Sequence, residues 1–235
     1  MIQSQLNEGI LTVTLDRPDQ SNSFTCEMFR TMRERMKDAA LNSQIRVIIL
    51  QAQGDHFSLG QDIEDLSHSQ LDARHPALTF MREFALFPKP IIANVQGNAF
   101  GFGMALLLHC DLVVADPNSR FQLPFIRQEL MPLFATSMLL PQRVGPQRSA
   151  ALLLLAQQFS AEQACQWGLI NEVANAETRQ QLVTSWSQQL SQMPELLVRQ
   201  TKQLLLNGQP TNDKVMCNEW HLFSESLHLP ESQTS

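Results

Sequence analysis

A glycine-rich turn between a buried strand and a buried helix is the stretch of this sequence best suited to chemistry. Residues 91–95 form a short apolar run with β-branched side chains, which predicts a buried strand. Gly97, Gly101 and Gly103 follow, and the apolar run 104–108 then predicts a buried helix. Glycine lets a ligand approach the main chain, and the first N–H groups of a helix lack partners within it. Such a turn can bind an oxygen atom that gains negative charge during a reaction.

The composition limits the classes of partner that the protein can have. The chain has 235 residues, of which 43% are hydrophobic and 17% are charged, so it can bury a sizeable core. The net charge of −6, without a cluster of lysine, arginine and aromatic residues, predicts no nucleic-acid partner. We find no apolar run of membrane-spanning length and no signal-peptide pattern at the N-terminus. We therefore expect a cytoplasmic protein without a membrane partner.

The cysteines and glycines argue against several cofactors. Cys26, Cys110, Cys165 and Cys217 are scattered without metal-ligand spacing, which is typical of reduced cytoplasmic thiols and predicts no metal site. Gly101-x-Gly103 does not match the G-x-G-x-x-G pattern of dinucleotide-binding loops. The chain has no tyrosine, which removes one common general acid.

Hydrophobic periodicity predicts the elements that lead to the glycine turn. Alternation over residues 11–15 indicates a half-buried strand, and the continuous apolar run 47–50 indicates a strand covered on both faces. Helical spacing predicts helices over 25–40 and 77–86, and the polar stretch 64–77 predicts a surface loop or an irregular helix. The first helix has an apolar stripe that we interpret as core packing: Met28, Met32 and Met36.

Strands and helices alternate through the middle of the chain, and helices dominate after about residue 134. Further strands are predicted at 112–115, 120–123 and 170–173, and helices at 177–192, 195–207 and 212–227. Ser160 and Gln163 form a capping-box pattern at the start of another helix, which Gly168 is placed to end. This order predicts a largely parallel sheet with right-handed crossovers.

Short motifs recur in a fixed order along nearly the whole chain. They are Asp16-Arg17-Pro18, Phe57-x-x-Gly60-x-Asp62, Lys89-Pro90 with Gly97, Gly101 and Gly103, Cys110-Asp111, Phe121-Gln122-x-Pro124-Phe125, Leu140-Pro141-x-Arg143-x-Gly145, and Ala161-Glu162-x-Ala164 with Gly168-Leu169. Together they resemble the crotonase (enoyl-CoA hydratase/isomerase) superfamily. The motifs after Phe121 are most similar to the branch that includes the peroxisomal-type enoyl-CoA isomerases.

The resemblance implies a fold and a class of substrate. The fold class is α/β, with a spiral core of repeated ββα units over residues 1–175 and a C-terminal helical trimerisation region over residues 176–235. The assembly implied is a homotrimer or a dimer of trimers. The implied partner is an acyl-CoA thioester from fatty acid metabolism, so coenzyme A enters as part of the substrate and no cofactor is bound permanently.

The resemblance also implies a site made largely of main-chain groups. The N–H groups of Gln61 and Phe102 would form an oxyanion hole, which hydrogen-bonds the thioester carbonyl as it becomes an enolate. The substrate-binding positions implied beside them are Leu59, Gly60, Asp62, Ile63, Gly101 and Gly103. Leu59 and Ile63 fall where the family lines its coenzyme A channel. Asp62 is also a candidate helix cap.

The usual acid and base residues of the family are absent from this sequence. Hydratases that resemble this chain carry glutamates at the positions of Ala105 and Phe125, and isomerases carry one at Leu133. Because these apolar side chains cannot carry protons, they would instead line an apolar pocket for the acyl group. Glu129 is the candidate for a relocated base, and the other interpretation is a solvated loop carboxylate. His109, in the apolar helix, is interpreted as a core histidine.

Two classes of function therefore stay open. One is an enzyme of the enoyl-CoA isomerase or hydratase type that stabilises a thioester enolate. The other is a catalytically degenerate protein that binds acyl-CoA or serves as an oligomeric scaffold. Divergent chemistry on the same fold, decarboxylation or thioester hydrolysis, is a third alternative, since the oxyanion hole would supply most of the rate there.

Overall fold

A six-stranded sheet forms the centre of the computed structural model, which describes residues 1–207 and 212–227. The strand order is β1-β2-β3-β4-β6-β9, with only the β1–β2 hairpin antiparallel within this sheet. The strands are β1 (Ile2–Asn7), β2 (Ile10–Leu15), β3 (Val47–Ala52), β4 (Ile91–Val95), β6 (Leu112–Ala115) and β9 (Glu172–Val173). The prediction of a largely parallel sheet is confirmed.

A second layer of short strands runs beside this sheet. Its strands are β5 (Ala99–Phe100), β7 (Arg120–Gln122) and β8 (Phe159–Ser160), in the order β5-β7-β8. Isolated parallel bridges, Ser58 to Ala99 and Phe24 to Gln61, extend the layer. The chain repeatedly passes from a strand of the large sheet to a segment of this layer and then to a helix. This repetition confirms the predicted spiral of ββα units.

Helices cover the sheet because their apolar residues recur at helical spacing. The helices before the C-terminal region are α1 (Cys26–Leu41), α2 (Ile63–Ser67), α3 (Pro76–Ala85), α4 (Phe102–Leu107), α5 (Thr136–Val144), α6 (Pro146–Leu154) and α7 (Ala161–Gln166), with 3-10 turns η1 (Pro18–Gln20) and η2 (Phe125–Gln128). Met28, Met32 and Met36 of α1 are all buried, which confirms them as core packing. Every residue of α4 is buried, as expected of a central helix.

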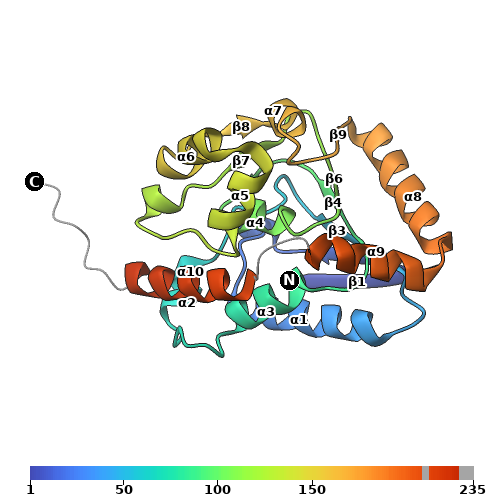
Figure 1. Cartoon of the computed structure of the whole chain (residues 1–235), viewed down its shortest axis with the longest axis horizontal. Coiled ribbons are helices and arrows are strands. Elements are labelled where there is room, and N and C mark those ends of the chain that lie inside the picture. The colour runs from blue at the N-terminus through green and yellow to red at the C-terminus, as the bar shows by residue number, and fades with distance from the viewer. Residues whose placement is uncertain (208–211, 228–235) are drawn as a thin grey trace, which may run out of the picture.

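Strand β3 shows how the sheet is covered on both faces. Ile48 and Leu50 point into the main core with α1, whereas Val47 and Ile49 pack with Val183 on the other face. Val183 belongs to α8 (Ala176–Gln192), which runs along that face in Figure 1. The continuous apolar pattern of β3 therefore arises because both faces of the strand are covered, as predicted.

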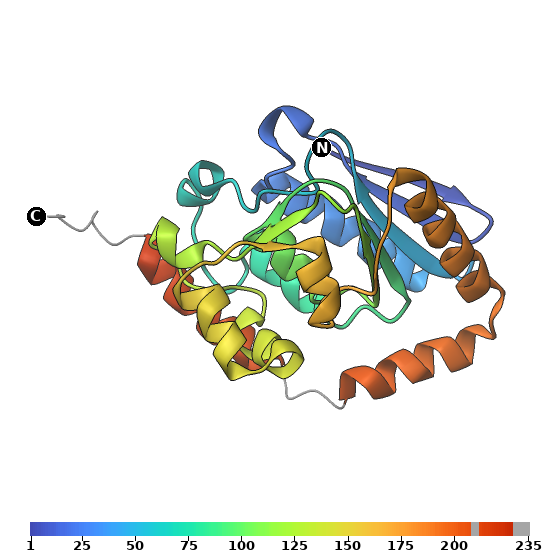
Figure 2. The same cartoon turned by 90° about the horizontal axis from the view of Figure 1, so that it is seen from above.

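The remaining C-terminal helices leave the sheet and return to the other end of the molecule. Helix α9 (Glu195–Asn207) runs along the outside in Figure 2, and α10 (Asn212–Leu227) packs against α3 and α5. Of the helices in the described ranges, none is long and apolar enough to cross a membrane. The predicted tail after Leu227 lies outside the described residues.

Four local features differ from the sequence prediction or extend it. Strand β1 was not predicted, because its residues lie at the sheet edge, are mostly exposed and show no alternation. Residues 64–67 lie in the short helix α2, residues 68–75 form turns and bends, and α3 begins at Pro76. The strand predicted at 170–173 is only β9. The C-terminal helices begin at Thr136, because Phe134 and Ala135 adopt a left-handed backbone that interrupts helical structure.

Candidate functional site

Two loops lie against each other at the start of α4. A Cβ atom added to Gly60 would lie 3.4 Å from the Phe100 carbonyl oxygen and 3.6 Å from the Phe102 nitrogen. A Cβ atom on Gly103 would lie only 2.4 Å from the carbonyl oxygen of Ser58. Glycine at these positions therefore allows the 58–61 segment to contact the first turn of α4.

The main-chain N–H of Gln61 points away from its neighbouring segment. The Phe24 N–H donates to the Gly60 carbonyl (2.8 Å), and the Asp62 N–H donates to the Phe24 carbonyl (2.9 Å). The described peptide bonds are trans, so the Gln61 N–H points opposite to the Gly60 carbonyl and away from Phe24. Within the described ranges, this N–H has no protein acceptor.

The main-chain N–H of Phe102 also has no acceptor among the described residues. Phe102 is the first residue of α4, and the Ala105 N–H donates to the Gly101 carbonyl (3.0 Å) inside the helix. Because the peptide is trans, the Phe102 N–H points out of the helix end. No residue in the part of the chain that the structure describes accepts it. Each of the two loops in contact thus carries a main-chain N–H that has no acceptor among the described residues.

Buried side chains fix the first of these loops. Asn22 donates through Nδ2 to the carbonyls of Gln53 and His56 (2.8 Å each), and the Ser58 hydroxyl donates to the Asn22 carbonyl (2.9 Å). Both Asn22 and Ser58 are fully buried. These hydrogen bonds anchor the segment that leads to Gln61 to the residues around Asn22.

Asp62 acts as the predicted helix cap. Its carboxylate accepts the Asp65 N–H (3.1 Å) at the start of α2 and pairs with Arg17 (2.8 Å). Partial burial alone would raise the pKa of Asp62, but the Asp65 N–H and the Arg17 guanidinium hold that pKa below its ordinary value. Asp62 is thus an engaged, ionised carboxylate with a structural role.

The apolar positions that replace the expected carboxylates are buried around α4. Ala105, Phe125 and Leu133 are each at most 2% exposed. The Pro124 Cδ, next to Phe125, lies 4.0 Å from where a Gly101 Cβ would be. After Leu133, the Phe134 ring stacks on the Phe102 ring, with centroids 5.5 Å apart. The structure therefore places the 124–134 segment beside Gly101 and Phe102, at the start of α4.

Comparison with known proteins then decides the family. A sequence profile described as enoyl-CoA hydratase/isomerase matches residues 5–233. The chain belongs to the enoyl-CoA hydratase/isomerase family of enzymes. The 1,2-epoxyphenylacetyl-CoA isomerase of Escherichia coli K12 is 33% identical over 222 residues, covering 90% of this chain and 83% of that protein. The peroxisomal enoyl-CoA delta isomerase 3 of mouse is 26% identical over 84% of this chain and 64% of that protein.

Two solved structures support the assignment of this chain to the enoyl-CoA hydratase/isomerase family. The structure of Pseudomonas aeruginosa OdaA superposes with a TM-score of 0.92 at 35% identity, covering 98% of this chain and 95% of that one. A structure from Acinetobacter baumannii, described as an enoyl-CoA hydratase/isomerase, has a TM-score of 0.90 at 29% identity and covers 97% of both chains. The crotonase fold implied by the motifs is confirmed.

The two ionisable candidates of the sequence lie in different surroundings. The His109 Nε2 donates to the Phe134 carbonyl (2.8 Å), and burial lowers the pKa of His109 to about 3. His109 is therefore a neutral, hydrogen-bonded core histidine, as interpreted. Glu129 is exposed and ends η2 with a left-handed backbone (φ 58°). Its role as a relocated base stays a prediction.

Sequence reasoning missed one buried carboxylate near the 124–134 segment. Glu219 of α10 is 4% exposed and accepts the N–H groups of Ala135 (2.6 Å) and Ser137 (2.9 Å). The available signal was its spacing, because Glu219 falls on the same helical face as the buried Met216 and Phe223. A charged residue on an apolar stripe indicates a buried partner elsewhere in the fold.

Proposed function

We propose that this protein binds an acyl-CoA thioester and stabilises its enolate, in a reaction of the enoyl-CoA isomerase or hydratase type. The two unpaired N–H groups of Gln61 and Phe102, on loops in contact, carry this proposal. Donors aimed at an oxyanion in a water-poor site contribute about 3–4 kcal/mol each to lowering a barrier. The Escherichia coli and mouse relatives are both named as isomerases of CoA thioesters, which supports the same substrate class.

The acyl group that fits this site is apolar. Ala105, Phe125 and Leu133, buried and uncharged, support an aliphatic or aromatic acyl chain beside the thioester. Gly60, Gly101 and Gly103 allow the thioester carbonyl to approach the main chain, and Leu59 and Ile63 line the path of coenzyme A. The only cofactor chemistry required is that of the coenzyme A carried by the substrate.

Proton transfer has to come from a group other than the usual glutamates. Glu129 is the proposed relocated base, since it ends η2 directly after the segment that carries Phe125. The buried, apolar nature of Ala105, Phe125 and Leu133 also favours a second candidate function. In that case the protein binds the thioester and polarises its carbonyl without moving protons.

Deuterium exchange at Cα of a saturated acyl-CoA separates these functions. The purified protein is incubated with the thioester in deuterated water, and mass spectrometry follows the exchange. Exchange above the buffer rate is expected. Binding without exchange, across aliphatic and aromatic thioesters, would overturn the enzymatic proposal and support the binding protein. Malonyl-type thioesters, with product analysis, test for decarboxylation and hydrolysis in the same samples.

The role of Glu129 is tested in the same assay. Glu129→Gln is expected to lower the exchange rate at least tenfold while acyl-CoA affinity is retained. Glu177→Gln, an exposed substitution in the first turn of α8, is the matched control and is expected to exchange at the parent rate. Parent-like exchange in Glu129→Gln would assign the base to another group.

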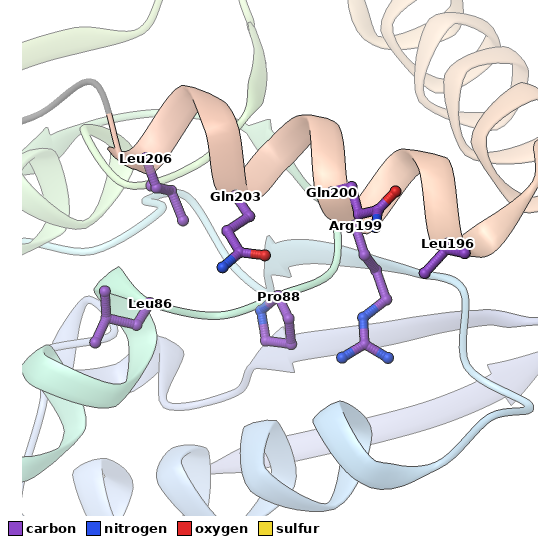
Figure 3. A pocket seen from close by; sticks show the side chains of 7 residues that line it. All are labelled: Leu86, Pro88, Leu196, Arg199, Gln200, Gln203 and Leu206. Carbon is purple, nitrogen blue, oxygen red and sulfur yellow. The ribbon is translucent and has the colours of Figure 1, made fainter.

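The proposed assembly is a homotrimer or a dimer of trimers, with residues 176–235 as the trimerisation region. Exposed apolar side chains of α9 support it, because Leu196, Leu197, Leu204 and Leu205 are each at least 59% exposed. A cleft of about 590 Å³ separates α9 from Leu86 and Pro88, with Arg199 and Gln203 pointing toward Pro88 (Figure 3). Light scattering coupled to size exclusion measures the assembly, and a monomer would contradict the proposal.

A further inference from the structure

A carboxylate from the C-terminal helix holds the turn that precedes α5. Glu219 accepts the Ala135 N–H, the Ser137 N–H and the Ser137 hydroxyl. A buried carboxylate is stable only when such donors replace its water. Since 82 residues separate Glu219 from Ser137 in sequence, this contact fixes α10 to α5.

The turn that Glu219 holds has an unusual backbone. Phe134 (φ 62°) and Ala135 (φ 56°) both lie in the left-handed region, which residues with a Cβ rarely adopt. Two such residues in a row persist only when their surroundings determine them. The Glu219 carboxylate provides that determination from one side, because it accepts the N–H between these two residues.

The same turn also contacts the proposed oxyanion hole, through the side chain of Phe134. The Phe134 ring lies 5.5 Å from the Phe102 ring at an interplanar angle of 8°, and it stacks on the His109 ring with centroids 3.8 Å apart. The Phe134 carbonyl accepts the His109 Nε2–H. The Phe134 ring and carbonyl therefore contact Phe102 in α4 and His109 just after that helix. The N–H of the following residue, Ala135, binds Glu219.

We infer that Glu219 is a positioning residue for the reaction. Through the Ala135 N–H it keeps the Phe134 ring stacked on Phe102, and so fixes the direction of the Phe102 N–H that faces the thioester oxygen. This inference rests on the proposed function. It assigns a role in carbonyl polarisation to the C-terminal helix, which lies outside the spiral core.

The test measures polarisation of a bound thioester directly. A chromophoric aryl-enoyl-CoA absorbs at longer wavelength when hydrogen bonds to its carbonyl withdraw electron density. The variants are Glu219→Gln, which is isosteric but has only one acceptor oxygen, and Glu219→Asp, which keeps the charge on a shorter side chain. Glu225→Gln is the control, since Glu225 lies on the same helix, is exposed and pairs only with His221 in the described chain.

The expected result is a loss of polarisation in a folded protein. Glu219→Gln should bind the chromophore within about threefold of the parent affinity, lose at least half of the absorbance shift and exchange Cα protons at least tenfold more slowly. Glu219→Asp should recover part of the shift, and Glu225→Gln should match the parent. Near-ultraviolet circular dichroism checks that each variant is folded.

Two different failures are distinguishable. If the parent protein shifts the absorbance and folded Glu219→Gln shifts it equally, Glu219 is only a structural cap and the inference is overturned alone. If Glu219→Gln does not fold, Ser137→Ala, which removes one donor to the same carboxylate, must reduce the shift, and an unchanged shift overturns the inference. If the parent itself produces neither shift nor exchange, the proposed function fails and this inference fails with it.

Discussion

Lys202 and Asp111 join the outer helix α9 to the first residues of the inner strands β4 and β6. The Lys202 Nζ lies 2.7 Å from the Asp111 Oδ2 and donates to the Lys89 carbonyl at 2.8 Å. Asp111 also accepts the Ile91 N–H at the start of β4. In the described part of α9, Lys202 is the only buried side chain. Lys202 is therefore the buried anchor of α9 in the described residues, and the Arg46–Glu195 ion pair (3.9 Å) holds the start of the same helix.

Replacing this cation should loosen α9 and destabilise the chain. Lys202→Met leaves the Lys89 carbonyl without its donor and the Asp111 carboxylate without its counter-charge. We expect a loss of about 1–3 kcal/mol in the free energy of unfolding, because the carbonyl of the buried Lys89 becomes unpaired. Urea denaturation measures the loss, and Lys214→Met, at an exposed position of α10, should stay within about 0.5 kcal/mol of the parent. Equal midpoints for the two variants would contradict the prediction.

Gly103 provides a test of the contact between the two loops of the candidate site. Glycine inside a helix normally costs about 1 kcal/mol relative to alanine, so Gly103→Ala would stabilise α4 if space allowed. The added Cβ would instead lie 2.4 Å from the Ser58 carbonyl oxygen, and the loops would have to separate. We expect a net destabilisation of about 1–3 kcal/mol and loss of Cα proton exchange. A more stable Gly103→Ala with parent-like exchange would refute this account of the site.

Local rules explain why much of the fold was predictable. Strand β4 matches its predicted range, 91–95, because a run that is apolar except for Asn94 lies between Pro90 and Gly97. The capping box of Ser160 and Gln163 is confirmed at the start of α7, because both of its hydrogen bonds join residues three positions apart. The cap formed by Asp62 is likewise local. Interactions within one turn of chain can be identified from sequence alone.

The parts that could not be predicted depend on distant residues or on main-chain direction. No local signal marks Phe134 and Ala135 as left-handed, since the groups that hold them come from α4 and α10. The Gln61 and Phe102 roles also have no side-chain signature, so only the resemblance suggested them. Whether their N–H groups are unpaired depends on the directions of the Gly60 and Gly101 carbonyls. These directions follow from the three-dimensional structure and have no signal in the sequence.

Acid should destabilise the protein through its buried histidines. His75 accepts the Ala77 N–H through Nδ1 (3.1 Å) as the cap of α3, and burial lowers its pKa to about 4. The ordinary value in an unfolded chain is about 6.5, so between these values the unfolded state binds more protons. The stability is thus complete above about pH 6.5 and decreases as the pH falls toward 4. His109, with a pKa of about 3, acts in the same direction.

The contribution of His75 can be isolated with a cap that does not titrate. His75→Asn keeps an acceptor at the start of α3, because asparagine is a favourable N-cap residue. Urea midpoints between about pH 7 and 5 should fall less steeply for this variant than for the parent. Between pH 7 and pH 5, the parent should lose about 2 kcal/mol more of its free energy of unfolding than His75→Asn loses. His221→Asn, at an exposed histidine, should follow the parent slope. Parallel slopes for all three proteins would contradict the low pKa of His75.

Cys26 lies beside a histidine but should be unreactive. Its Sγ is 3.5 Å from the His75 Nε2, an arrangement that could suggest an activated thiol. The His75 Nδ1 accepts a main-chain N–H, so the Nε2 carries the proton of the neutral ring and donates to Ser69 (2.8 Å). His75 therefore cannot take the thiol proton. Burial, and then the neighbouring Asp65, raise the pKa of Cys26.

Alkylation kinetics test this interpretation of the thiols. With iodoacetamide at about pH 7.5, the partly exposed Cys165 and Cys217 should be labelled first, and Cys26 at least tenfold more slowly. Cys110 should be the slowest, because burial raises its pKa to about 12 and leaves about 10³-fold less thiolate than an ordinary cysteine. If His75→Asn slowed the labelling of Cys26, His75 would be acting as its base, and the assigned tautomer would be wrong. An unchanged or faster rate is expected, since the His75 Nε2 that faces Cys26 already carries a proton and is no proton acceptor.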